Sequence, residues 1–251
     1  MPPYILKPIK LEDCRDHGAK SGAELFVVEG DSAAGAVTVL RNAIFQAVLP
    51  MQGKPLNALK ATANKVNTNE LYGKLATALG VPLVDGHRAK AMQSQLTLGL
   101  EAPTLGPTSA PSELQDLRYE RVLLLFDPDA DGIHIGALML MFFARWMRPL
   151  LEAGRIEMVR PPLFEITWQQ NNQACAAPLL AYSISHRDAI HRQLTQQGAT
   201  GINFRHFRGL GSIDQTLLLK TCIDPKNRLA QVMSIQDAQA AIEVFGNPSP
   251  R

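Results

Sequence analysis

Four acidic residues follow two short apolar runs of the sequence and could act together. Glu29 comes after one run, and the alternating acids Asp127, Asp129 and Asp131 come after the other. Carboxylates held close together repel one another and raise one another's pKa unless a cation is present. Such hard oxygen ligands suit Mg²⁺, which keeps several waters and shares its coordination shell with substrate phosphates. The sequence therefore predicts a metal site, provided that the fold brings the two acidic motifs together.

Either motif taken alone has a second interpretation. The aspartates of residues 127–132 could cap the following helix, and Asp31 could be an N-cap just after a surface acid, Glu29. The spacing Asp-x-Asp-x-Asp-Gly also matches the start of an EF-hand calcium loop. In that loop the twelfth position would be Leu138, where a bidentate Glu is required. The presence of both motifs favours the metal site over these alternatives.

The two apolar runs predict strands that would position the acids. Residues 24–28 and 121–126 have the pattern of buried strands, and each is followed by a tight turn and a helix, the second helix covering about 133–151. Residues 156–160 predict a third strand of this series, and residues 47–49 predict a short strand closed by Pro50. The fold class is therefore α/β with a parallel central sheet. In such a sheet the functional crevice lies beyond the carboxyl ends of the strands, where both acidic motifs stand.

The alternation of apolar strands and helices ends at Pro161 and Pro162. We expect an N-terminal arm (1–20), an α/β domain (21–165) and a small α+β C-terminal appendage (166–251), and residues 99–112 predict a loop because of their Gly and Pro content. The appendage is predicted to contain short strands near 164–168 and 181–184, and helices that start at the capping patterns of Ser185, Ser212 and Ser234.

The composition is that of an ordinary globular protein. Hydrophobic residues make up 46% and charged residues 19% of the 251 residues, which argues against a disordered or fibrous chain. The three cysteines are far apart and odd in number, so they predict neither a disulfide framework nor a zinc site, and the N-terminus lacks a signal-peptide pattern. These features favour the cytoplasm. The most apolar stretch, 135–144, is about ten residues long, too short to cross a bilayer.

Charge is nearly balanced overall, but basic residues gather in two segments. Residues 51–92 contain six basic and two acidic side chains, and residues 199–231 contain five and two. A net charge of +2 neither requires nor forbids nucleic-acid binding. A basic run taken alone is more often a solvated face than a binding site.

Several motifs, in order, resemble the TOPRIM domain of the B subunits of type IIA topoisomerases, that is, of gyrase B and its topoisomerase IV counterpart. The resemblance runs from about Leu11 to Val244. The matching segments are Glu-Gly-Asp-Ser-Ala at 29–33, Phe-Gln-Ala-Val-Leu-Pro-Met-Gln-Gly-Lys-Pro-Leu-Asn at 45–57, Asp-Pro-Asp-Ala-Asp-Gly-Ile-His-Ile at 127–135, Pro-Pro-Leu-Phe at 161–164, Arg-His-Phe-Arg-Gly-Leu-Gly at 205–211 and Asp-Pro-Lys-Asn-Arg at 224–228.

The resemblance implies a Rossmann-like TOPRIM domain that holds one or two Mg²⁺ ions beside the scissile phosphate of double-stranded DNA, while a tyrosine of a gyrase-A-type or topoisomerase-IV-A-type partner attacks. It implies that Glu29 is a metal ligand and a general acid or base, that Asp127 and Asp129 are catalytic metal ligands, and that Asp131 is a weaker metal candidate. It also implies that Lys54 lies near the DNA backbone and that Arg205 and Arg208 are candidate DNA or partner contacts. We assign no role to His134.

The sequence also departs from the family pattern. None of Tyr4, Tyr72, Tyr119 and Tyr182 stands in a family-like nucleophile context, so another polypeptide would supply the tyrosine. The chain has no glycine-rich ATP lid and no P-loop lysine, so we expect no ATP site in it, and a separate polypeptide would carry any ATPase. Ser212 stands where the family motif usually has Glu.

Three hypotheses about function remain open at this point. The first is a cytoplasmic, nucleoid-associated topoisomerase component, an isomerase subunit that is active only with its A-type partner and does not associate with membranes. The second is a non-catalytic regulatory module that binds DNA or a topoisomerase. The third is an autonomous nuclease in which metal-activated water replaces the tyrosine.

Overall fold

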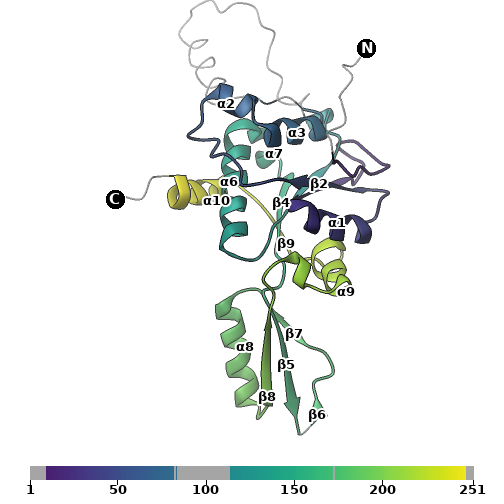
Figure 1. The fold of residues 1–251 in the computed structure, drawn as a ribbon, viewed down its shortest axis with the longest axis vertical. Helices are drawn as coiled ribbons and strands as arrows, with labels where there is room; N and C mark the ends of the chain where they lie inside the picture. Colours follow the sequence, from purple (N-terminus) through teal and green to yellow (C-terminus); the bar gives the residue numbers. More distant parts are fainter. Residues whose placement is uncertain (1–9, 82, 84–113, 172, 247–251) are drawn as a thin grey trace, which may run out of the picture.

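The computed structural model describes residues 10–81, 83, 114–171 and 173–246, which form a larger lobe and a smaller, elongated one (Figure 1). The expected loop at 99–112 lies outside the described residues. The larger lobe is built on a five-stranded sheet with the strand order β2-β1-β3-β4-β9. Its strands are β1 (Glu24–Glu29), β2 (Gln46–Met51), β3 (Arg121–Leu125), β4 (Ile156–Val159) and β9 (Ala230–Val232).

The first four strands of this sheet are parallel, which confirms the α/β class. In the register, Val27 of β1 pairs with Leu49 of β2 on one side and with Leu124 of β3 on the other. Only β9 is antiparallel, and it pairs with β4. The prediction that Pro50 closes the second strand is wrong, because Pro50 lies inside β2 opposite Val28. Proline is tolerated there because β2 is the edge strand of the sheet.

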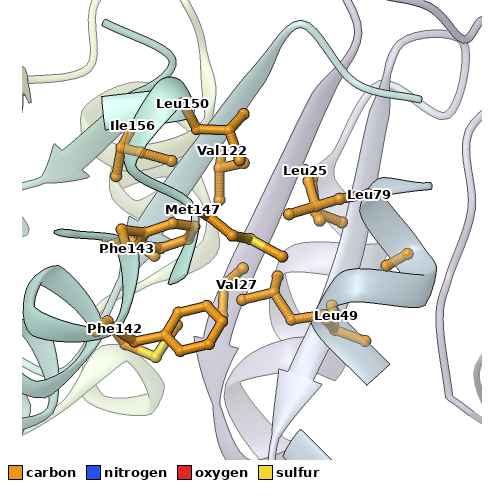
Figure 2. Packing of buried hydrophobic residues seen from close by; sticks show 14 of the residues in the cluster. Leu25, Val27, Leu49, Leu79, Val122, Phe142, Phe143, Met147, Leu150 and Ile156 are labelled. Carbon is orange, nitrogen blue, oxygen red and sulfur yellow. The ribbon is translucent and has the colours of Figure 1, made fainter. Parts of the chain in front are cut away.

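Both faces of the sheet are covered, so its strands are apolar on both sides. Alternate residues point to opposite faces of a strand. Leu25 and Val27 belong to one core and Phe26 and Val28 to the other. The first core packs against α3 (Glu70–Leu79), α6 (Ala130–Trp146) and α7 (Arg148–Glu152), as Figure 2 shows for part of it. The second packs against α1 (Gly30–Leu40), α9 (Gln215–Leu218) and the flanking turns η1 (Leu210–Ser212) and η2 (Leu219–Ile223).

The helix expected at 133–151 is present but divided. It begins at Ala130, because Asp129 is its N-cap, and it is interrupted at Met147 before α7, which has a proline in its first turn. A short helix, α2 (Ala63–Asn67), precedes α3, and neither was predicted from the sequence. None of the helices in the described part of the chain is long and apolar enough to cross a membrane.

The smaller lobe is a second sheet with one helix. Strand β5 pairs antiparallel with its three neighbours. Its small core includes Phe164, Ile166, Ala181 and Leu194, the last from the helix α8, which lies beside the sheet (Figure 1). The elements are β5 (Phe164–Gln170), β6 (Gln173–Ala174), β7 (Leu179–Ala181), α8 (Ile184–Gln196) and β8 (Thr200–His206).

Several of the helices and strands predicted after residue 164 begin at other residues than expected. The strand expected at 181–184 is β7, which ends where the expected strand begins. The residue that caps α8 is Ser183 and not Ser185, and the cap of α9 is Asp214 and not Ser212. Ser234 caps α10 (Ile235–Ala241) in a capping box with Asp237, as predicted.

The chain returns to the larger lobe after the second sheet. Strand β9 joins the first sheet, and α10, followed by η3 (Ile242–Gly246), packs against α6. Residues 166–251 therefore contribute to both lobes. The expected boundaries at 20/21 and 165/166 stay a prediction.

Candidate metal centre at the carboxyl end of the sheet

Glu29 is the last residue of β1 and lies at the carboxyl end of the sheet. Gly30 follows with a φ of +76°, a left-handed conformation that turns the chain directly from the strand into α1. The Glu29 side chain is partly buried, and burial raises the pKa of its carboxyl, as do the charges of the three aspartates of the second motif. The Lys54 ammonium opposes this and lowers the pKa. The fold thus brings the two acidic motifs within electrostatic reach of one another.

Asp127 follows β3 at the same edge and is held on two sides. Its backbone lies against the first turn of α6, where a Cβ on Gly132 would come within 2.0 Å of the Asp127 carbonyl oxygen. Its carboxylate accepts a hydrogen bond from the backbone N–H of Leu210 to Oδ1 at 2.8 Å. Burial raises the pKa of Asp127, and the Asp129 charge raises it further, while the Leu210 N–H lowers it.

Asp129 and Asp131 are exposed and engaged in different ways. Asp129 Oδ1 accepts from the Gly132 N–H at 2.9 Å and caps α6, so the capping interpretation of this motif is correct for Asp129. One cap bond occupies a single oxygen, and the other oxygen of Asp129 makes no hydrogen bond to the described residues. Asp131 Oδ1 lies 3.1 Å from Lys54 Nζ. Capping and metal binding are therefore compatible in this loop.

The donor set fits a hydrated divalent cation. Glu29 and Asp127 are partly buried carboxylates whose pKa values are raised in part by neighbouring negative charge, which is the electrostatic condition a cation relieves. Among the described residues, no three of these acids place ligand atoms within 4.8 Å of one another. Mg²⁺ keeps several waters in its coordination shell, so it does not need all of its ligands from the protein.

A second cluster of metal-ligand types, which sequence reasoning missed, lies at Asp13, Cys14 and His17. Their ligand atoms come within 4.8 Å of one another. Asp13 Oδ1 already accepts from Tyr119 Oη at 2.6 Å, and Arg118 donates to Oδ2 at 2.7 Å. The guanidinium thus occupies the position next to the carboxylate that a cation would take.

Ionisation in this cluster also disfavours a metal. Although burial opposes it, hydrogen bonds from His17, Tyr119 and Arg118 hold the pKa of Asp13 well below its usual value. Burial, reinforced by the Asp13 charge, raises the pKa of the Cys14 thiol to about 11, so the thiolate a metal needs is scarce at neutral pH. The cluster ties residues before β1 to those before β3. The Asp-Cys-x-x-His spacing was the only signal of it in the sequence.

The three predicted DNA-contact residues lie in different settings. Lys54 joins the acidic edge through Asp131. Arg205, on β8, donates to the Ser212 carbonyl at 3.1 Å and lies 3.6 Å from Glu165, and it does not contact the acids. Arg208 is exposed, has no hydrogen bond or ion pair with the described residues, and directly precedes Gly209, whose backbone lies against the Asp127 carboxylate.

Three further residues, to which the sequence analysis gave no role, make contacts in the structure. Lys10 Nζ lies 2.7 Å from Asp31 Oδ2, to which Gln52 also donates, and neither residue was singled out from the sequence. His134, left without a role, stacks on Phe245 with ring centroids 5.2 Å apart, so it packs against η3.

Comparison with known proteins agrees with this geometry. The Toprim domain family matches residues 24–161. The chain is 35% identical over 242 residues to the DNA gyrase B protein of Mycobacterium leprae (strain TN), covering 95% of this chain and 31% of that protein. It is 34% identical over 242 residues to the DNA gyrase B protein of Mycobacterium tuberculosis (strain H37Rv), with the same coverage. It is 32% identical over 238 residues to the DNA gyrase B protein of Streptococcus pneumoniae serotype 4, covering 95% of this chain and 32% of that protein. The chain thus spans about a third of the length of these curated relatives.

Proposed function

Because this chain belongs to the Toprim domain family, we propose that it is the Mg²⁺-binding component of a type IIA DNA topoisomerase, an isomerase that cleaves and religates double-stranded DNA together with an A-type partner. The observation that carries the proposal is the convergence of Glu29 with Asp127, Asp129 and Asp131 at the carboxyl edge of the main sheet, beside Lys54. The similarity to gyrase B over nearly the whole chain supports the choice of reaction.

The acids would have distinct tasks at this edge. Asp127 and Asp129 would hold the cation with Glu29, and Asp131 would assist them. When bound, Mg²⁺ would neutralise the charge that develops on the phosphate and would orient the attacking and leaving oxygens. Glu29 is partly buried and has a raised pKa, so its carboxyl is suited to give a proton to the leaving 3′ oxygen and to take it back on religation.

The nucleophile would come from the partner. Among the described tyrosines, Tyr72 donates its hydroxyl hydrogen bond to the Leu56 carbonyl, and Tyr119 donates to Asp13. Burial raises the pKa of both phenols and also that of Tyr182. A phenol that must attack phosphorus needs to lose its proton and reach the DNA, and the buried hydroxyls of Tyr72 and Tyr119, which are engaged elsewhere, are unsuited to this.

Basic side chains near the acidic edge would hold the DNA backbone. Lys54 and Arg208 are exposed enough to meet a phosphate. Lys54 pairs directly with Asp131, and Arg208 precedes Gly209, which lies against Asp127. Phosphate contacts of this kind fix the position of a duplex without reading its sequence. The substrate would then be double-stranded DNA, and the protein would act in the nucleoid.

A plasmid cleavage assay tests this proposal. The purified chain is incubated with supercoiled plasmid and Mg²⁺, with and without a gyrase-A-type protein, and the reaction is stopped with denaturant and protease. We expect nicked and linear DNA only when both chains are present, and loss of cleavage with Asp127→Asn, which removes the charge but keeps an oxygen to accept from Leu210.

The remaining outcomes would overturn the proposal in favour of a different function. Metal-dependent cleavage by the chain alone would make it a nuclease that uses activated water. DNA or partner binding without cleavage in either mixture, unchanged by Glu29→Gln, would make it a regulatory module.

A further inference from the structure

The turn at residues 208–212 crosses from the smaller lobe to the metal centre and lies against the carboxylate of Asp127. Leu210 donates its backbone N–H to Asp127 Oδ1 at 2.8 Å across a sequence separation of 83 residues. Asp127 Oδ2 accepts no hydrogen bond from the described residues, and the backbone of Gly209 lies against it. The turn therefore donates a hydrogen bond to one oxygen of the carboxylate and packs against the other.

Gly209 is required at this position by space and not by backbone conformation. Its φ of −177° and ψ of 170° are extended values that any residue adopts. A Cβ on Gly209, however, would come within 2.7 Å of Asp127 Oδ2 and 3.0 Å of Cγ. An alanine there would displace the carboxylate or push the turn away from it.

The turn is held rigidly enough to act as a support. Ser212 Oγ donates to the Gly209 carbonyl at 2.6 Å, and the Ser212 N–H donates to the same carbonyl at 3.0 Å. The Leu210 side chain is buried in the second core, and Arg205 of β8 donates to the Ser212 carbonyl at 3.1 Å. The serine that replaces the usual family acid thus closes the turn.

We propose that the 208–212 turn is a positioning element of the metal centre, in which Gly209 and the Leu210 N–H aim the Asp127 carboxylate at the cation. This inference rests on the proposed function, because it assigns the turn to the metal site of that reaction. Outer groups that orient a ligating carboxylate typically change metal affinity by about 10- to 100-fold when they are lost. The smaller lobe, through β8 and this turn, then contributes to metal binding without supplying a ligand.

Mn²⁺ binding provides the test, because Mn²⁺ prefers oxygen ligands like those of Mg²⁺ and is followed by electron paramagnetic resonance without any DNA or partner. Gly209→Ala is compared with Gly211→Ala, which lies in the same turn, has a backbone conformation open to alanine and would place its Cβ within 4 Å of nothing. We expect Gly209→Ala to weaken Mn²⁺ binding at least about tenfold and Gly211→Ala to change it less than about twofold.

A second pair of variants separates positioning from a general loss of structure. In the Asp127→Asn background, where the remaining acids still bind Mn²⁺ weakly, Gly209→Ala should have no further effect if it acts through Asp127. If Gly209→Ala fails to fold by circular dichroism, Ser212→Ala, which only loosens the turn, carries the test and should weaken binding by about two- to fivefold.

Each outcome is decisive. Equal Mn²⁺ affinity of Gly209→Ala, Gly211→Ala and the wild type would overturn the inference. So would a Gly209→Ala change that weakens Mn²⁺ binding in the Asp127→Asn background as much as in the wild type. If Gly209→Ala does not fold, unchanged Mn²⁺ affinity of Ser212→Ala would overturn it instead. Mn²⁺ binding by the wild type that Asp127→Asn does not alter would instead overturn the proposed metal site itself, so the two failures are distinguishable.

Discussion

Lys54 Nζ lies 3.1 Å from Asp131 Oδ1, and this ion pair joins the segment after β2 to the first turn of α6. The side chains of Lys54 and Asp131 are 45% and 78% exposed, so the pair itself adds little to stability. Its importance is one of position, because a positive charge stands beside the acids and lowers the pKa of Glu29. A phosphate that approaches the proposed metal centre would therefore meet a cationic side chain at the rim of the acidic edge.

The first prediction concerns DNA binding by Lys54. Lys54→Ala should weaken duplex binding by about three- to tenfold and lower the slope of log affinity against log salt by about one, because one phosphate contact is lost. Fluorescence anisotropy of a labelled duplex over a range of salt concentrations measures both quantities. Lys65→Ala is the matched control, since Lys65 is an exposed lysine of the same basic segment on α2. An equal loss in both variants would mean that general charge, and not the site, binds the DNA.

The second prediction concerns pH and metal. The pKa values of Glu29 and Asp127 are raised in the folded state, first by burial and then by neighbouring carboxylates. A raised pKa means that the folded state holds the proton more tightly, so the stability these groups contribute is present below their ordinary pKa values and is lost as pH rises through the raised ones. In the absence of metal, the contribution of these two groups to the melting temperature should fall as pH rises through their raised pKa values.

Added Mg²⁺ and the variant Asp127→Asn test the predicted direction of this pH dependence. Metal binding requires deprotonated ligands, so added Mg²⁺ should raise the melting temperature more at pH 7 than at about pH 4.5. Asp127→Asn should remove part of the pH dependence and melt above the wild type at pH 7 without metal, by about 2–4 °C for each kcal/mol of repulsion removed. The melting temperature of the wild type minus that of Asp127→Asn, both without metal, should fall as pH rises, and a difference that rises with pH would contradict the direction assigned to Asp127.

The positions of Glu29 and Asp127 in the fold could be predicted from the sequence. The apolar runs 24–28 and 121–126 predicted β1 and β3 because a strand buried on both faces is apolar throughout. Parallel neighbours then bring Glu29 and Asp127 to one edge, and this follows from connectivity alone. Strand β8, by contrast, is mostly exposed, and β9 has only three residues, so neither carries a strong hydrophobic pattern.

Contacts between segments that are distant in the chain could not be predicted from the sequence. The Leu210 N–H bond to Asp127 and the Tyr119 bond to Asp13 join segments that are far apart in the sequence, so no local spacing predicts these two bonds. The displaced caps have a more local cause. Ser183 and Ser185 are both suitable N-caps, and their hydroxyl groups lie 2.9 Å apart, so the choice between them depends on where β7 ends.

The third prediction concerns Gly132 and the folding of the acidic loop. Gly132→Ala would place a Cβ within 2.0 Å of the Asp127 carbonyl oxygen, so the loop and the start of α6 must separate, at a cost of about 2–4 kcal/mol in the free energy of unfolding. Urea denaturation followed by circular dichroism measures it. Gly35→Ala in α1 meets nothing within 4 Å and should instead stabilise the protein by about 0.5–1 kcal/mol. Similar effects from both variants would contradict the close approach at Gly132.

The fourth prediction concerns the opposite end of the sheet, where Glu24 is completely buried. Arg228 donates to both oxygens of Glu24, at 2.6 and 2.7 Å, and Arg121 lies 2.9 Å from the same carboxylate. Arg228→Ala removes two charge-assisted bonds and leaves the carboxylate to Arg121 and Gln46 alone, so it should destabilise the protein by about 3 kcal/mol.

The control for this variant is the exposed Arg192, whose change to alanine should alter the free energy of unfolding by less than about 0.5 kcal/mol. Because the Arg228 cluster lies at the amino ends of the strands, Arg228→Ala should leave Mn²⁺ affinity unchanged wherever the protein remains folded. A loss of metal binding in the folded variant would show that the two ends of the sheet are coupled.

Anomalous diffraction from crystals soaked in Mn²⁺ is the decisive test of the metal centre, because it locates the bound ion without any assumption about activity. We expect an anomalous peak at the carboxyl edge of the sheet, within bonding distance of Asp127 and at least one of Glu29 and Asp129, and a weaker peak there in Asp127→Asn crystals soaked at the same Mn²⁺ concentration. A peak at Asp13, Cys14 and His17, or no peak at the acidic edge at saturating Mn²⁺, would contradict the assignment of the four acids as a metal site.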